Sequence, residues 1–137
     1  MQNIQFDDGM KSYQLNQGGL LRFNPADPNI YARFMQLEEK LDQLQQALST
    51  DPDMASQLER ADRGVKELLG WVFGRHNDFD ALLGGVSLLA VADNGKRVLN
   101  NFLEALAPVL EQGAQQCAAD LTAEAVQQAQ DRRENQC

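Results

Sequence analysis

The sequence predicts a mainly α-helical protein, a helical bundle with a small antiparallel β element at its N-terminus. Apolar residues alternate with polar ones near the start of the chain, and from residue 28 onward they recur every three or four positions. These two spacings are typical of strands and of amphipathic helices, respectively. Because the 137 residues are 43% apolar, we expect residues 1–137 to form a single domain with one packed core.

Residues 1–23 are expected to form a short β-meander. Asp8-Gly9 suits a tight hairpin turn, because glycine adopts positive φ without strain, and residues 17–19 provide a second turn. A meander this small needs the helices to support it. The three expected strands are residues 4–6, 11–15 and 20–23.

A helical hairpin is predicted next, from residues 28–49 and 54–73. Pro25 ends strand pairing because it has no N–H to donate. Asp27 can accept hydrogen bonds from the free N–H groups of the first helical turn, and Pro28 suits the first helical position. Apolar residues then repeat at steps of four and three in both helices. They are Ile30, Phe34, Leu37, Leu41, Leu44 and Leu48, followed by Met54, Leu58, Ala61, Val65, Leu68 and Val72.

The spacing leaves open what these two apolar stripes pack against. They can pack on each other and on the remaining helices, or one of them can face a partner or a second copy of the chain. Trp71, Phe73 and Phe79 leave a similar choice between core and binding hot spot, because large aromatic side chains serve in both. Cys117 is expected to be a small core residue.

The second half of the chain is predicted to contain shorter and then longer helices. Residues 77–92 are expected to form short helices closed by glycines. Asp93 can cap a long helix over residues 94–126, and Pro108 should kink it by removing one backbone hydrogen bond. Residues 127–137 are a polar tail that is either frayed or a helix that needs a partner.

Charge excludes several classes of partner. The net charge is −8, and a surface of this sign repels phosphate backbones and anionic lipids unless basic residues form a local patch, which is not seen. No apolar run approaches the roughly 20 residues of a membrane-spanning helix, and the N-terminus lacks a secretory signal. We therefore expect a cytoplasmic protein that binds neither nucleic acid nor membranes.

The sequence also argues against an enzyme. The one histidine, His76, forms a His-x-Asp-x-Asp pattern with Asp78 and Asp80. Zinc sites usually draw their ligands from well-separated positions. We therefore interpret this segment as a helix start, capped by Asn77 or Asp78, beside a solvated histidine. Phosphate-binding loops and recognisable catalytic triads are missing as well. The expected protein is not an enzyme and has no cofactor.

Three phrases resemble one family, the tail assembly chaperones of siphophages and prophages of Gram-positive bacteria. The first is RFNPADPNIYARFMQLEEKLDQL, where a short strand ends in "FNP-x-DP" before a long amphipathic helix. The others are LLGWVFGRHNDFDALLGG and NFLEALAPVLEQ, and together the three cover residues 20–115. The chain departs from the family pattern in residues 75–80 and in its Gln- and Ala-rich end after residue 113.

The resemblance implies a non-enzymatic role during construction of a phage tail in the bacterial host cytoplasm. Such proteins are expected to bind the tape measure protein, keep it soluble and help tail tube subunits polymerise around it, and to be absent from the mature particle. The alternative is a structural head–tail or tail completion protein that is retained in the virion. A metal-dependent factor built on His76 is a weaker third hypothesis. A homo-oligomer stays open.

A partner surface can be placed on the first and last long helices as a hypothesis. A tape measure protein exposes apolar helical stripes, and a chaperone can cover them with amphipathic helices of its own. The same side chains can equally belong to the core. The candidate partner-binding residues are Tyr31, Phe34, Met35, Phe102 and Leu106.

Overall fold

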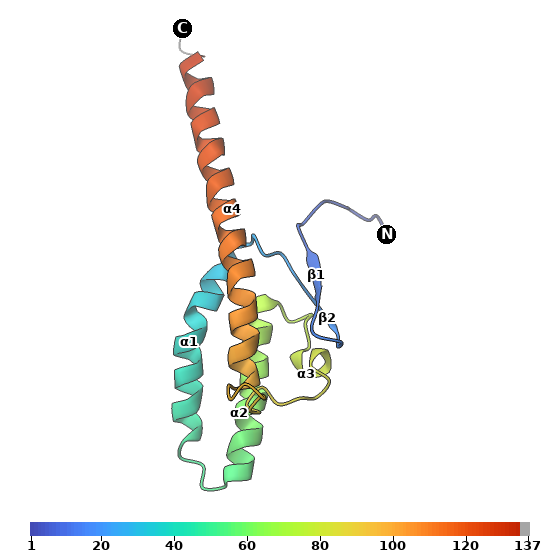
Figure 1. The fold of residues 1–137 in the computed structure, drawn as a ribbon. Helices are drawn as coiled ribbons and strands as arrows, with labels where there is room; N and C mark the ends of the chain where they lie inside the picture. Colours follow the sequence, from blue (N-terminus) through green and yellow to red (C-terminus); the bar gives the residue numbers. More distant parts are fainter. Residues whose placement is uncertain (135–137) are drawn as a thin grey trace.

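The fold is mainly helical, with a small two-stranded antiparallel sheet near the N-terminus, as the sequence predicts (Figure 1). The computed structural model describes residues 1–134, without the side chains of residues 120, 122–125, 133 and 134. The elements in order are β1 (Lys11–Gln14), β2 (Leu20–Phe23), α1 (Pro28–Leu48), α2 (Met54–Phe73), α3 (Phe79–Leu82) and α4 (Val98–Glu134).

The N-terminal region is a hairpin of two strands, whereas a three-stranded meander was expected. β1 and β2 pair antiparallel, and the turn between them places Asn16 at a φ of 53°. Residues 4–6 form no strand. The carboxylates of Asp7 and Asp8 accept the N–H groups of Gly9 and Met10, and the Asn24 amide donates to the Asp8 carbonyl, so these contacts hold residues 7–10 in place of the expected hairpin turn.

The helical hairpin has the start signals that the sequence contains. α1 covers Pro28–Leu48 and α2 covers Met54–Phe73, against predicted ranges of 28–49 and 54–73. The side chains of Asp27 and Asp53 each accept a backbone N–H of the first helical turn, from Asn29 and Ala55. Pro28 occupies a first-turn position, where its missing N–H costs nothing.

The apolar stripes of α1 and α2 mainly pack inside the molecule. Leu37 and Val65 are buried in one hydrophobic cluster, and Leu41 and Leu44 pack against it. Trp71 lies half-buried on α2, where its ring lies beneath two cations of α1. The Arg33 guanidinium is 5.9 Å and the Lys40 ammonium 5.4 Å from its ring centroid.

Residues 77–97 contain one short helix and a series of turns, rather than several short helices. α3 is capped by Asp78, whose carboxylate accepts the N–H groups of Asp80 and Ala81. Asp93 does not cap α4, because the helix begins only at Val98. The N–H groups of Val98 and Leu99 donate to the carbonyls of residues 90 and 88, so tertiary backbone contacts do the work of a cap.

α4 is longer than predicted. It runs from Val98 to Glu134 and continues through Pro108, so most of the predicted polar tail, residues 127–134, is helical. Residues 135–137 lie outside the described residues. In Figure 1 the first half of α4 lies beside α1 and α2, and its second half projects from the body.

Gly113 marks the point where α4 leaves the body. It is buried, and a Cβ at this position would overlap the carbonyl of Pro25. The junction between β2 and α1 therefore lies directly on the backbone of α4. Only glycine allows two backbone segments to approach so closely.

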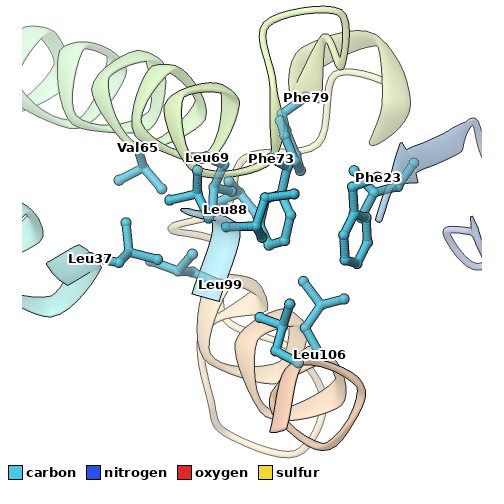
Figure 2. Close-up of a cluster of buried hydrophobic side chains, with 13 residues drawn as sticks. Phe23, Leu37, Val65, Leu69, Phe73, Phe79, Leu88, Leu99 and Leu106 are labelled. Atoms are coloured by element: carbon cyan, nitrogen blue, oxygen red, sulfur yellow. The ribbon is translucent and has the colours of Figure 1, made fainter. Parts of the chain in front are cut away.

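A chain of aromatic rings connects the sheet to α4 through the core. Ring centroids are 5.2 Å apart for Tyr13 and Phe23, 5.0 Å for Phe23 and Phe73, and 6.0 Å for Phe73 and Phe79. Phe79 continues the series to Phe102, also at 6.0 Å. Aliphatic residues of three helices and the 83–97 loop complete this cluster, and Figure 2 shows Leu37, Val65, Leu69, Leu88, Leu99 and Leu106 among them.

Asn77 fixes β2 to the end of α2. Its side-chain oxygen accepts the N–H of Arg22 and its amide donates to the Arg22 carbonyl, both at 2.9 Å, while a further bond reaches the carbonyl of Phe73. Asn77 is 5% exposed. One side chain thus pairs the outer edge of β2 as a neighbouring strand would.

Replacing Asn77 by alanine should lower the free energy of unfolding by about 2 kcal/mol, because the Arg22 N–H loses its partner in a partly buried site. Urea denaturation followed by circular dichroism measures the change. Asn100→Ala is the control, because Asn100 is exposed on α4. Equal destabilisation by both substitutions would contradict the role given to Asn77.

Candidate partner-binding groove

The five residues proposed from the sequence occupy different environments. Met35 is 62% exposed on α1, whereas Leu106 is 6% exposed within the core. Tyr31, Phe34 and Phe102 are half-buried and pack against the core cluster. Leu106 is therefore not available to a partner in this structure, and Met35 is the one of the five that is exposed.

A groove lies between the first turn of α1 and the middle of α4. Its volume is about 520 Å³. Tyr31 is the one sequence-proposed residue among those that line it, and α4 contributes most of the others. The lining residues are Pro28, Tyr31, Glu111, Ala114, Gln115, Cys117, Ala118 and Leu121.

Apolar side chains continue from this groove along both helices. Tyr31 and Met35 are four residues apart on α1, and Cys117 and Leu121 are four apart on α4, so each pair lies on one helix face. Leu121 is 61% exposed although it is apolar. We call Met35, Tyr31, Cys117 and Leu121 the apolar strip.

The α4 half of the strip was not proposed from the sequence. Cys117 was expected in the core, but it is half-buried at the rim of the groove. Leu121 lies within the predicted long helix of residues 94–126. The signal was the i, i+4 spacing of Cys117 and Leu121. This spacing alone does not identify a surface site, because nothing local in the sequence indicates that α1 ends its contact with α4 near Gly113.

Electrostatics of the groove are simple. Among the lining residues, Glu111 is charged. The other polar side-chain groups there are the Gln115 amide, the Tyr31 hydroxyl and the Cys117 thiol. The surface is suited to apolar contact with one acidic group at its border. It offers nothing that resembles an acid–base pair.

A second, charged pocket of about 600 Å³ lies between α2 and α3, around Lys66. The Lys66 ammonium is 2.8 Å from the Asp62 carboxylate and 2.6 Å from that of Asp80. Burial lowers the pKa of Lys66, but the hydrogen bonds and charges of these two carboxylates outweigh it, so its pKa is raised above the ordinary value. Lys66 thus stays protonated and fastens α3 to α2.

The His-x-Asp-x-Asp segment does not converge on one point. His76 bonds through Nε2 to the Arg22 carbonyl, Asp78 caps α3, and Asp80 pairs with Lys66. The sequence left either Asn77 or Asp78 as the cap of α3. Asp78 is the cap, and Asn77 instead binds β2. Within the part of the chain that the structure describes, no three His, Cys, Asp or Glu side chains are grouped to hold a metal ion.

None of the helices over the described residues is both long and apolar enough to span a bilayer. No protein-family model, no curated protein and no solved structure matches the chain.

Proposed function

We propose that this chain is a phage tail assembly chaperone that binds the tape measure protein and assists polymerisation of the tail tube around it. The proposal includes that it acts in the cytoplasm of a bacterial host, is not an enzyme, and is absent from the mature particle. Its support is the resemblance of three phrases in residues 20–115 to that family, together with the geometry described above.

The apolar strip is the observation that carries the proposal furthest. Leu121 is 61% exposed and lines the groove together with Tyr31 and Cys117, and Met35, which is 62% exposed, lies one helical turn from Tyr31 on α1. Isolated exposed apolar residues are ordinary on a protein surface, but a strip that continues into a groove is typical of a docking surface. A partner helix laid along it would contact α1 and α4 at once.

The partner chemistry follows from the shape and charge of this surface. An amphipathic helix with apolar residues at three- and four-residue spacing can place one stripe into the groove, in the helix-in-groove mode of recognition. Glu111 at the border favours a basic residue beside that stripe. The net charge of −8 would keep the joint complex in solution.

Co-expression tests the function itself. The tape measure protein of the same phage is produced with and without this chain, and the soluble fraction is compared by centrifugation and gel densitometry. We expect the tape measure protein to be soluble and to co-purify with the chain. An unchanged soluble fraction would overturn the chaperone proposal.

Leu121→Ser is expected to weaken tape measure binding roughly tenfold, because an exposed apolar anchor of a helix groove contributes about 1–2 kcal/mol. Val126→Ser is the matched control: Val126 is 52% exposed on the same helix. It points roughly 140° away from Leu121, given about 100° per helical residue. Affinities from biolayer interferometry decide, and equal losses for the two variants would exclude the strip as the binding face.

A structural protein retained in the virion is the alternative function. The observation that favours it is the exposed N-terminal segment, in which Ile4 and Phe6 are 84% and 78% exposed, beside a two-stranded sheet with an open edge. Ring-forming particle proteins can join their subunits through such strands. Mass spectrometry of purified virions separates the two functions, because a chaperone is absent and a completion protein is present.

A further inference from the structure

An open groove lies between α1 and α2 beside Trp71. Its volume is about 460 Å³. Leu44 and Leu68 line it together with Trp71, and no described residue of α4 or of the 83–97 loop takes part. The helical hairpin and the residues directly after it therefore form this groove alone. We call it the tryptophan groove.

Three cationic side chains gather at the tryptophan groove. Lys40 and Arg75 line it, and both are exposed. The Lys40 ammonium lies 5.4 Å and the Arg33 guanidinium 5.9 Å from the centroid of the Trp71 ring. Among the described residues that line the groove, Glu67 is the acid, so the groove carries a net positive charge on a chain whose net charge is −8.

These three cations form no ion pair with any described residue. The chain contains 20 acids for 12 bases, so carboxylates to pair with them are not scarce. Arg33 uses one of its N–H groups, which donates to the Trp71 carbonyl at 3.4 Å. The indole ring holds Lys40 and Arg33 in place by cation–π attraction, and their remaining N–H groups are left for an external acceptor.

We propose that the tryptophan groove binds an acidic helical segment of another protein. Carboxylates four residues apart on such a helix share one face and can approach the cations of α1 and Arg75 at once. Each contact is a charge-assisted hydrogen bond, which is stronger than a neutral one. An apolar residue beside the carboxylates would pack on Trp71, Leu44 and Leu68, and tryptophan and arginine are enriched among the residues that dominate interfaces.

The surroundings of the groove favour a protein segment over a nucleic acid. Glu38, Glu39 and Asp42 are exposed on the same helix as Arg33 and Lys40. A phosphate backbone carries a negative charge at every step, and it would meet these carboxylates as well as the cations. A helix can instead limit its acids to the one face that lies opposite the cations.

The tryptophan groove and the apolar strip lie on different faces of α1. Tyr31 and Arg33 are two positions apart, which places them roughly 160° apart around the helix. Lys40 follows Arg33 by about two helical turns and so returns to the same face. The two surfaces can therefore be occupied at the same time, and this inference does not rest on the function proposed above.

Isothermal titration calorimetry at low ionic strength tests the site. The probe is an alanine-based helical peptide with glutamates at positions i, i+4 and i+7 and a leucine at i+3. We expect it to bind the unaltered chain one to one. A peptide with glutamines in place of the glutamates should bind about tenfold more weakly, because the charge-assisted contacts are lost. Equal affinity for the two peptides would overturn the proposal, and so would the absence of binding.

Lys40→Gln and Arg75→Gln locate the binding. Each should weaken binding of the acidic peptide about threefold, and the double variant roughly tenfold, because each exposed ion pair contributes modestly. The double variant of Lys11→Gln with Lys96→Gln is the control, since it removes the same charge from two exposed residues outside the groove. An equal loss in this control would mean attraction to the whole molecule and would overturn the site.

Two further results would assign the groove to another occupant and overturn the proposal. One is single-stranded DNA that binds more tightly than the acidic peptide and is weakened by Lys40→Gln. The other is a dimer in sedimentation equilibrium that Lys40→Gln with Arg75→Gln dissociates, which would identify a second copy of the chain. Leu121→Ser should leave the affinity for the acidic peptide unchanged, so failure of this site is distinguishable from failure of the tape measure proposal.

Discussion

Replacing Phe73 by alanine is expected to lower the free energy of unfolding by about 4 kcal/mol, the usual cost of a large cavity in a packed core. Phe73 is 2% exposed, and its ring lies between those of Phe23 and Phe79. The substitution removes the contact that joins the sheet to α2 and α3 (Figure 2). Guanidinium denaturation followed by circular dichroism measures the loss.

Phe6→Ala is the control for this prediction, because it deletes the same side chain at a position that is 78% exposed. It should change the free energy of unfolding by less than about 0.5 kcal/mol, as surface substitutions usually do. A small effect of Phe73→Ala, similar to that of Phe6→Ala, would mean that the aromatic chain does not hold the fold together.

Gly113→Ala is expected to cost about 3 kcal/mol, the upper end of ordinary overpacking, because the new methyl group meets a backbone carbonyl. The Pro25 carbonyl cannot swing aside as a side chain can. Either α4 separates from the β2–α1 junction or the junction distorts. Thermal unfolding and one-dimensional NMR of the methyl region report both outcomes.

Gly64→Ala provides the matched comparison. Gly64 is also inside a helix, but the atoms nearest to an added Cβ there are side-chain carbons of Leu44, which can shift. Both substitutions gain about 1 kcal/mol of helix propensity. The difference between them therefore isolates the crossing at Gly113, and a Gly113→Ala variant as stable as Gly64→Ala would show that the backbones do not meet there.

The starts and ranges of α1 and α2 can be predicted from the sequence because they depend on local signals. Asp27 and Asp53 start α1 and α2, and both residues act on groups only two positions away. Helix ranges followed because caps and apolar spacing are short-range signals. Residues 77–97 differ from the expected short helices because their hydrogen bonds are long-range: the Leu88 N–H donates to the Asp62 carboxylate, and the Leu88 carbonyl accepts from the Leu99 N–H.

The site was less predictable than the fold for the same reason. Tyr31 and Met35 could be placed on the correct helix, but their neighbours on α4 depend on where that helix crosses the β2–α1 junction. Leu106 has the same apolar character as Leu121 and is buried instead. Periodicity gives the face of a helix, and only the crossing at Gly113 decides which turns of that face stay exposed.

The single tryptophan gives the molecule an internal reporter. Trp71 belongs to α2, while the two cations above its ring, Arg33 and Lys40, belong to α1. Separation of the two helices would remove both charges from the indole and shift its fluorescence emission. Emission therefore follows opening of the helical hairpin, and it can be recorded in dilute solution without attaching a dye.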